Sequence, residues 1–154
     1  MDAHDNNISY DMAALPIDRN MTRIVGHGID IVELREFEIL IERAGEHFVS
    51  RCFTEHERSY AADGPNRTAR LAVRFAAKEA VLKAVGTGWI GGISWQDVEI
   101  IHQRSGAPLV KLSGELARIA AELGVARFHV SLSHTKTLAT ASVIAVANDP
   151  APAN

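Results

Sequence analysis

Asp30 and Glu79 are the residues whose types most clearly indicate a chemistry. Neither carboxylate has a histidine or cysteine partner nearby, so the pair favours a hard cation that prefers oxygen ligands. Magnesium commonly uses one or two protein carboxylates and completes its octahedron with water and phosphate oxygens. Positive side chains close to Glu79 would serve the phosphate oxygens, namely Arg74, Lys78 and Lys83. Together these residues predict a site for magnesium and pyrophosphate.

Glu79 must be positioned by a helix, which the apolar pattern predicts over residues 66–86. At about 100° per residue, most of the surface of this helix is apolar or small, and its charges fall in two narrow seams. Glu79 and Lys83 share one seam, and Arg74 and Lys78 share the other. A simpler interpretation of the first seam is a surface ion pair, which stabilises a helix by only about 0.3 kcal/mol.

Asp30 must be positioned by a strand, which the alternating pattern predicts at Ile24–Ile31. Gly26 and Gly28 lie on the same face of this strand as Asp30. Glycines inside a strand often mark the close approach of a ligand or of another backbone. A β-bulge or tight packing is an equally good interpretation.

The sequence Gly86-Thr87-Gly88 has the composition of a phosphate-binding loop but follows its helix instead of preceding it. The negative end of the helix dipole would repel an anion at this place. The position therefore favours Gly86 as a helix cap, and any phosphate near this loop must be held by lysine side chains.

His134 and Thr135 follow a predicted strand at residues 128–133, in a turn where side chains are commonly exposed and available for binding. A solvated turn histidine is the simpler interpretation. Ser133 beside His134 does not indicate a hydrolase triad, because no nucleophile-elbow glycines flank the serine.

The overall composition is that of an ordinary globular protein of one domain. The chain has 154 residues, 47% hydrophobic residues, 23% charged residues and a net charge of −3, which gives no general attraction to nucleic acid. A single cysteine excludes an internal disulfide framework and fits a reducing compartment. The polar N-terminus does not read as a signal peptide, and no apolar run reaches membrane-spanning length. These features predict a cytoplasmic protein that binds neither membranes nor nucleic acid.

Three segments divide the chain. Residues 1–22 are predicted to be a disordered leader, residues 23–147 one domain, and residues 148–154 a flexible tail.

Helices cluster after the first strand of the domain, and strand pairs with short turns fill its second half. The predicted elements after the first strand are a helix at 32–51 interrupted near Gly45, a short helix begun by the Thr54–Glu57 capping box, the helix at 66–86, strands at 97–102 and 109–112, a helix from Ser113 to Leu123, and strands at 128–133 and 138–147. This order predicts an α+β domain with a largely antiparallel sheet, because a doubly wound parallel sheet would need strands and helices to alternate.

Three ordered segments of the chain resemble the holo-acyl-carrier-protein synthases, which are small, single-domain 4′-phosphopantetheinyl transferases. They are GHGIDI at residues 26–31, RFAAKEAVLKAVGTG at residues 74–88 and VSLSHT at residues 130–135. The resemblance runs from about Arg23 to Ala147. It implies the 4′-phosphopantetheinyl transferase-like fold, a largely antiparallel sheet packed with helices.

The resemblance also implies an activity, the magnesium-dependent transfer of 4′-phosphopantetheine from coenzyme A to a serine of apo acyl carrier protein. The second product is adenosine 3′,5′-bisphosphate, and the activity supports fatty acid biosynthesis. By position, Asp30 and Glu79 look like the magnesium ligands, and Lys83 resembles the lysine that donates to the phosphates. Glu79 is our choice of base for the serine hydroxyl, directly or through a water molecule. Asp30, Glu79 and Lys83 thus form the expected catalytic set.

Further positions match residues that line the coenzyme A site of such proteins. They are Arg74, Lys78, Lys83, Gly86, His134 and Thr135, the last two towards the ribose 3′-phosphate. Family members of this size are typically homotrimers with sites between neighbouring subunits. The expected site residues therefore need not all come from one chain.

The acyl carrier protein implied as the partner is acidic and helical, and the family meets it with basic and apolar residues of the first helix. Candidates here are Arg35, Arg43, Phe48 and Arg51. The same segment departs from the family by carrying Glu36, Glu38, Glu42 and Glu46, which dilute its basic character. His27 is a second departure, since the family usually has an apolar residue there, and we expect it to point away from Asp30 and pack.

Two other functions stay open at the level of the residues. A magnesium-dependent pyrophosphatase or nucleotidyl enzyme could use the same carboxylates and lysines on another substrate. Alternatively, a noncatalytic module that binds coenzyme A could use the charges as structural pairs and the glycines only as turns. Mass gain of the carrier protein would separate a transferase from both.

Overall fold

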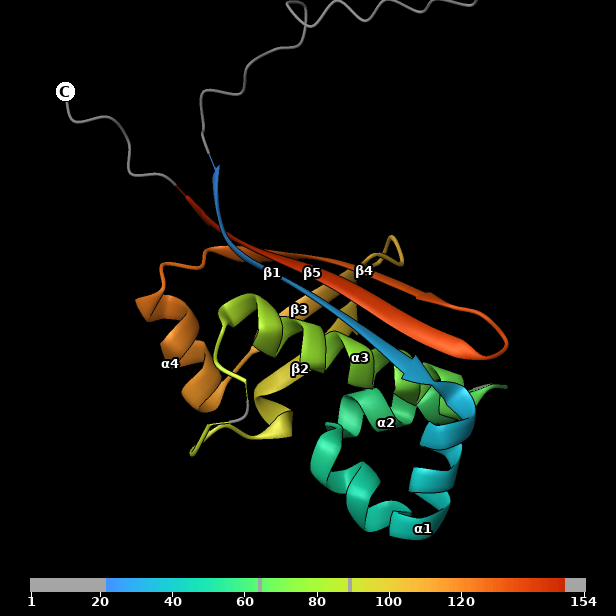
Figure 1. Ribbon diagram of the computed structural model, residues 1–154. Helices are drawn as coiled ribbons and strands as arrows, with labels where there is room; N and C mark the ends of the chain where they lie inside the picture. Colours follow the sequence, from blue (N-terminus) through green and yellow to red (C-terminus); the bar gives the residue numbers. More distant parts are fainter. Residues whose placement is uncertain (1–21, 64, 89, 149–154) are drawn as a thin grey trace, which may run out of the picture.

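The computed structural model describes residues 22–63, 65–88 and 90–148. The predicted leader and tail lie outside these residues except at their inner boundaries, where Thr22 begins the first strand and Asn148 ends the last. The elements in chain order are β1 Thr22–Glu33, α1 Leu34–Cys52, α2 Glu55–Ala62, α3 Arg67–Val85, the 3-10 turn η2 Trp95–Asp97, β2 Val98–His102, β3 Pro108–Leu112, α4 Gly114–Glu122, β4 Arg127–His134 and β5 Leu138–Asn148 (Figure 1).

The strands form two antiparallel sheets. The larger has the order β1-β5-β4, with Asp30 opposite Ala141 and Leu132 opposite the same alanine from the other side. The smaller pairs β2 with β3. Every described strand pairing is antiparallel, and the α+β class predicted from the order of elements is confirmed.

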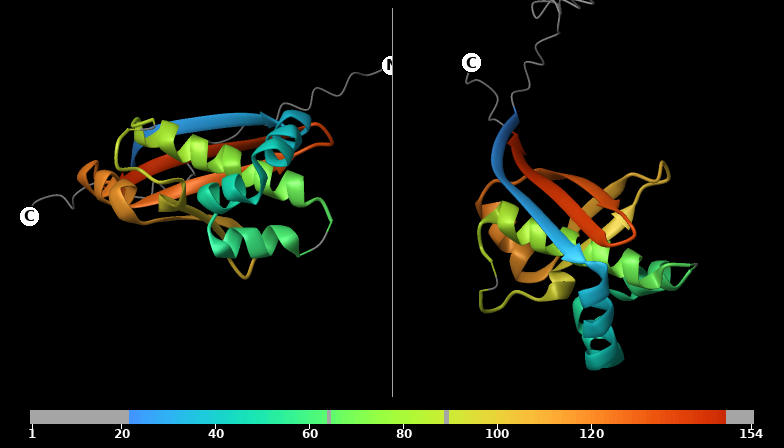
Figure 2. Two further views of the ribbon diagram at one scale, coloured as in Figure 1. Left: turned by 90° about the horizontal axis from the view of Figure 1, so that it is seen from below. Right: turned by 45° about the vertical axis from the view of Figure 1, so that its right-hand side comes forward.

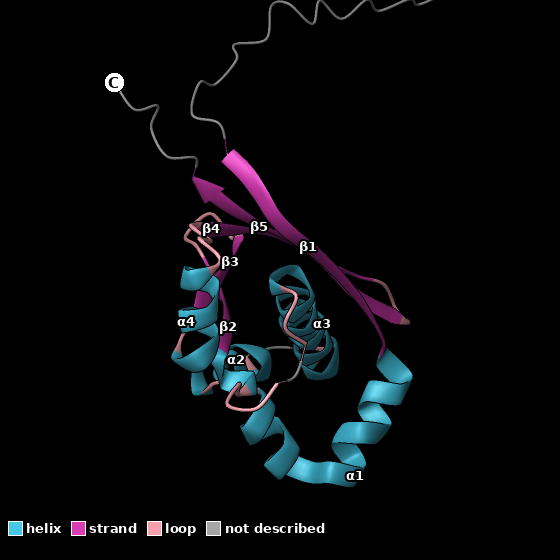
Figure 3. Cartoon of the chain, turned by 60° about the vertical axis from the view of Figure 1, so that its left-hand side comes forward, coloured by secondary structure: helices cyan, strands magenta, loops and turns pink. Residues whose placement is uncertain are grey.

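Helix α3 occupies the centre of the domain. It runs alongside β1 under the three-stranded sheet, and α1, α2 and β2 contact it from other sides (Figures 2 and 3). Its buried residues are mostly alanine and valine, so the helix can approach its neighbours closely. Most of the core lies between α3 and the elements around it.

The two strand glycines permit this close approach. A Cβ atom at Gly26 would lie 2.0 Å from the carbonyl oxygen of Ala84, and one at Gly28 would lie 1.9 Å from that of Ala80. No real side chain tolerates such distances, so the backbone of α3 excludes any larger residue at either place. The pairing of β1 with β5 also shifts register between Ile24 and Gly26. Tight packing and a strand irregularity thus account for the two glycines. This is the alternative interpretation, drawn from the sequence, to the approach of a ligand.

The caps and the helix-breaking glycine predicted from the sequence lie at or close to the observed helix ends and bend. Helix α1 bends at Gly45, whose φ of 66° lies in the left-handed region that favours glycine. Thr54 and Glu57 form the predicted capping box of α2. Ser113 occupies the N-cap of α4 without a side-chain capping bond. None of the helices in the described ranges is long and apolar enough to cross a bilayer.

Candidate active site

Asp30 and Glu79 line one open hollow of about 410 Å³ at the surface. Asp30 comes from β1 and Glu79 from α3, and the two are brought together because α3 packs along β1. Other walls come from β1, the first turns of α1 and the aromatic side of α3: Ile31, Val32, Glu33, Glu36, Phe37, Leu40 and Phe75. The hollow therefore combines two motif carboxylates with an apolar wall.

Lys83 completes this group one helical turn after Glu79. Its Nζ atom donates to the Asp30 carboxylate at 2.7 Å and to the carbonyl oxygen of Ile29 at 2.9 Å. The Lys83 side chain is 50% exposed, whereas that of Asp30 is 17% exposed. The lysine thus holds the strand carboxylate against α3, and half of its side chain stays exposed to solvent.

This donor set fits magnesium better than a transition metal. Within the described ranges, no group of three or more histidine, cysteine, aspartate or glutamate side chains could hold a metal. Magnesium needs only one or two protein carboxylates, because water and phosphate oxygens fill its other positions. Asp30 and Glu79 meet that requirement.

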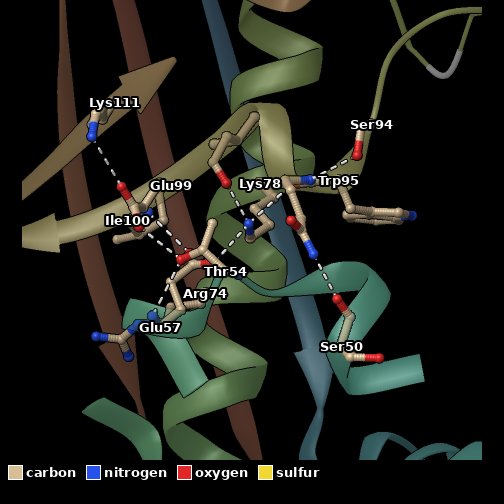
Figure 4. A network of polar contacts seen from close by, with 12 residues as sticks. Ser50, Thr54, Glu57, Arg74, Lys78, Ser94, Trp95, Glu99, Ile100 and Lys111 are labelled. Carbon is tan, nitrogen blue, oxygen red and sulfur yellow. Dashed lines mark hydrogen bonds and ion pairs between the residues drawn. The ribbon is translucent and has the colours of Figure 1, made fainter. Parts of the chain in front are cut away.

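Lys78 does not lie with these residues, contrary to our expectation that it faces phosphate. Its side chain is 0% exposed and forms a 2.8 Å ion pair with Glu57, which is also 0% exposed. Its Nζ atom further donates to the carbonyl oxygens of Trp95, at 2.9 Å, and Val98 (Figure 4). Burial lowers the pKa of Lys78, and the Glu57 carboxylate opposes that effect. All three donors of the ammonium group have protein acceptors, so coenzyme A cannot reach it.

Arg74 is buried as well, and its expected place in the coenzyme A site needs the same correction. Its side chain lies over the ring of Tyr60, 4.2 Å from the centroid, and donates to the carbonyl oxygen of Arg70 at 2.9 Å. Desolvation lowers the pKa of Arg74, and the nearby Glu57 carboxylate partly offsets that effect. The second polar seam of α3 is therefore an interior seam, because α2 and β2 cover it.

Gly86 acts as the helix cap that its place in the sequence favoured. Its φ is 76°, and its N–H group donates to the carbonyl oxygens of Leu82 and Lys83 at 2.9 and 3.1 Å. The residue is exposed and lies just beyond Lys83. Its N–H group is therefore used in hydrogen bonds within α3, while the residue itself stays exposed to solvent.

His134 is the last residue of β4, Thr135 follows it in the turn to β5, and both are exposed. The Thr135 hydroxyl accepts from the N–H groups of Thr137 and Leu138, at 3.2 and 3.1 Å, and so shapes the turn. Neither residue lines the hollow of Asp30 and Glu79. Strand β5 separates β4 from β1, which puts the two groups about 10 Å or more apart within one chain.

The pattern of the sequence did not reveal two structural roles. Phe37 and Phe75 form part of the wall of the hollow, with ring centroids 5.3 Å apart, a role that apolar periodicity alone does not distinguish from a place in the core. Glu57 was recognised as a capping residue, and its pairing with Lys78 depends on a contact between α2 and α3 that no local pattern encodes.

Cys52 is buried, and desolvation raises the pKa of its thiol to about 11, so it is a packing residue.

Known proteins resemble the chain along most of its length. A family model described as the 4′-phosphopantetheinyl transferase superfamily matches residues 26–144. A holo-[acyl-carrier-protein] synthase from Solibacter usitatus is 45% identical over 121 residues, which cover 79% of this chain and 97% of the relative. The crystal structure of the holo-[acyl-carrier-protein] synthase from Neisseria meningitidis has a TM-score of 0.74 at 35% identity and covers 80% of this chain and 98% of its own.

A second solved structure is a complex with a ligand. The holo-(acyl-carrier-protein) synthase from Bacillus anthracis, crystallised with coenzyme A (3′,5′-ADP), has a TM-score of 0.66 at 37% identity and covers 81% of this chain and 98% of its own. Fold and sequence therefore point to the same group of proteins.

Proposed function

The chain belongs to the 4′-phosphopantetheinyl transferase superfamily, among its holo-acyl-carrier-protein synthases, and from this premise we propose how its residues carry out the reaction. The enzyme transfers 4′-phosphopantetheine from coenzyme A to a serine hydroxyl of apo acyl carrier protein. Adenosine 3′,5′-bisphosphate is the other product. The observation that carries the proposal is the shared hollow of Asp30 and Glu79 beside the half-exposed side chain of Lys83.

Asp30 and Glu79 are the proposed magnesium ligands. When bound, magnesium supplies positive charge that neutralises the pyrophosphate of coenzyme A and its leaving group. The open hollow of about 410 Å³ that Asp30 and Glu79 line has room for a phosphate group.

Lys83 has a proposed role that changes during binding. Its ammonium group holds the Asp30 carboxylate in place, and half of its side chain remains exposed. A pyrophosphate in the hollow offers oxygen acceptors that compete for the same donors. Lys83 therefore moves some or all of its hydrogen bonds from Asp30 to the phosphates.

Glu79 is the proposed base for the attacking serine. A carboxylate next to the phosphate can accept the hydroxyl proton, directly or through a water molecule, as the oxygen attacks phosphorus. The serine oxygen–phosphorus bond forms while the bond from that phosphorus to the bridging oxygen of coenzyme A breaks. The leaving oxygen stays on adenosine 3′,5′-bisphosphate.

His134 and Thr135 enter this proposal through a second subunit. They lie away from the hollow of their own chain, so a site that uses both groups is best completed by a neighbour. The outer face of the large sheet offers a surface for such assembly. Ile29 and Ile31 are 53% and 62% exposed on that face, and the described helices pack on the other side (Figure 3). We place a homotrimer here, with active sites between subunits.

The carrier protein docks on α1 in this proposal. Arg43 and Arg51 offer positive charge, but Arg35 already pairs with Glu38 at 3.4 Å. Glu46 is likewise paired, with Arg67 of α3 at 2.7 Å. These internal ion pairs reduce both the attraction of the arginines and the repulsion of the glutamates towards an acidic partner. Apolar contacts, through residues such as Phe48, are therefore more important for docking.

Intact mass spectrometry of the carrier protein tests the function. Incubation with coenzyme A, magnesium and apo carrier should add the mass of one phosphopantetheine to the carrier. Asp30→Asn and Glu79→Gln should each lower the rate at least about 100-fold, because each removes a charge on which the phosphate chemistry depends. Glu122→Gln, on the exposed end of α4, is the matched control and should keep full activity.

Two results would contradict this assignment. Release of phosphate products from coenzyme A without modification of the carrier would instead establish a hydrolase. Unfolding of both carboxylate variants, seen by circular dichroism, would assign Asp30 and Glu79 to structure.

A further inference from the structure

We infer that Lys78 and Glu57 are positioning residues, whose buried ion pair sets the direction in which α3 presents Glu79 to Asp30. This inference rests on the proposed function, because it concerns the use of Glu79 as a metal ligand and base. Lys78 directly precedes Glu79 in the chain and is too deeply buried to contact a substrate. We assign it a role through Glu79.

The pair is buried and its hydrogen bonds are satisfied. Lys78 donates to the Glu57 carboxylate and to the carbonyl oxygens of Trp95 and Val98. Glu57 in turn accepts from the N–H group of Ile100 at 2.9 Å, and from that of Thr54 at 3.0 Å (Figure 4). Through these bonds α3 is fixed to α2, β2 and the η2 turn at one point. Any rotation or sliding of α3 would break several charged hydrogen bonds inside the protein.

A second fixed contact lies on the opposite side of α3. The carbonyl oxygens of Ala80 and Ala84 face the bare backbone of Gly28 and Gly26. At about 100° per residue, positions 78 and 80 point in directions about 160° apart around the helix. The helix is thus held from two nearly opposite sides, by the sheet and by the ion pair.

Glu79 lies between these two contacts. Its side chain projects about 100° from Lys78 and about 100° from Ala80, towards the hollow that it shares with Asp30. The glycine contact limits how far α3 stands from β1, but alanine surfaces offer few projections that would stop the helix from turning or sliding. The directional bonds of Lys78 supply that constraint.

The choice of an ion pair for this place has a physical reason. Replacing a buried, well-bonded ion pair with apolar groups is often neutral for stability, so such a pair is better explained by specificity than by stability. Here the specified quantity is the direction of one catalytic carboxylate. Lys78 and Glu57 act through Glu79 and do not touch substrate.

Manganese binding tests the inference without relying on turnover. Mn²⁺ affinity would be measured by calorimetry on the full-length protein, together with kcat and KM for coenzyme A in the presence of magnesium. Lys78→Met should weaken Mn²⁺ binding about tenfold and lower kcat about tenfold, with a change in KM below about threefold, because misdirection of Glu79 affects the metal and the reaction more than it affects binding of coenzyme A. Glu57→Gln should have the same pattern.

A stability control separates positioning from general damage. Leu116→Ala removes a 0% exposed core side chain from α4, far along the chain from Glu79, and should lower the melting temperature while leaving the Mn²⁺ affinity unchanged. If Lys78→Met alone does not fold, the double variant Glu57→Gln/Lys78→Met removes both charges and is measured instead. Unchanged Mn²⁺ affinity in a folded variant would overturn the inference. If the unmodified protein binds no Mn²⁺, or if Glu79→Gln binds it equally well, the proposed metal site is wrong instead.

Discussion

The Asp30 carboxylate sits between two positive partners, the lysine that holds it and the ion that we propose. Lys83 approaches it at 2.7 Å, and the 17% exposure of the Asp30 side chain makes the loss of a partner costly. The same ammonium group is available for phosphate, because half of its side chain faces solvent. At the scale of residues, the proposed mechanism therefore involves an exchange of partners around one carboxylate.

This exchange gives Lys83→Met two effects of opposite sign. Transfer activity should fall at least about tenfold, since a donor to the phosphates is lost. Stabilisation by saturating magnesium should increase by about 2–4 °C in melting temperature, because the ion no longer competes with an ion pair worth up to about 1 kcal/mol. Thermal melts with and without magnesium measure the second effect.

Lys111→Met provides the control. Lys111 pairs with the Glu99 carboxylate at 3.5 Å, with exposures of 67% and 18% that are close to those of the Lys83 and Asp30 pair. Its magnesium-dependent shift should equal that of the unmodified protein. An equal shift in both variants would show that Lys83 and the ion do not compete for Asp30.

Helix α3 connects the packing of the domain with its site. One side rests on the glycines of β1, a second carries the buried Lys78, and between them the Glu79 seam reaches the surface. Both carboxylates keep their places only if the spacing between α3 and β1 is preserved. The spacing of these two elements is therefore as important for the site as the carboxylates are.

Gly28→Ala tests this dependence. The added Cβ atom would meet the Ala80 carbonyl oxygen at 1.9 Å, so α3 must move away from β1. We expect a loss of about 3 kcal/mol in the free energy of unfolding, measured with urea, and a loss of transfer activity in the molecules that remain folded. Gly91→Ala is the matched control, because nothing lies within 4 Å of a Cβ atom there, and it should change stability by less than about 0.5 kcal/mol. Equal stability of the two variants would refute close packing at Gly28.

The molecule as a whole leaves one face of its large sheet open in the described part of the chain. Residues of β1 alternate between the α3 side and this face, where Ile29 and Ile31 are exposed and His27 bonds to Ser142 at 3.0 Å. His27 thus points away from the side of Asp30, as its place in the alternation predicted, but it is exposed and not packed as we expected. The two exposed isoleucines on this face are suited to contact with another copy of the chain.

Ile29→Lys tests this assembly. We expect the unmodified protein to have about three times the chain mass of 16.7 kDa in light scattering, and the variant to shift towards a single chain, because the buried lysine would lose its hydration. Leu123→Lys, which changes a 40% exposed leucine at the end of α4, should keep the larger mass. A monomeric unmodified protein would remove the proposed site between subunits.

Periodicity and caps predicted most of this fold because their causes are local. The Thr54–Glu57 capping box, the bend at Gly45 and the end of α3 at Gly86 each depend on a few neighbouring residues. The predicted strands at 97–102 and 128–133 likewise match β2 and β4 within a residue or two. The pairing of Asp30 with Glu79 came from the chemistry of the two carboxylates and from the resemblance, since no local pattern joins a strand to a distant helix.

The sequence by itself determined the elements, the order in which they occur and the carboxylates on which the proposed chemistry depends. Only the tertiary structure decided which charges of α3 face solvent. Lys83 and Lys78 are the same residue type in the same helix. In the structure, β2 and α2 bury Lys78 against Glu57, whereas the side chain of Lys83 stays half exposed beside Asp30. The physical reason is that burial depends on what packs against a helix from elsewhere in the chain, and periodicity within the helix carries no record of that partner.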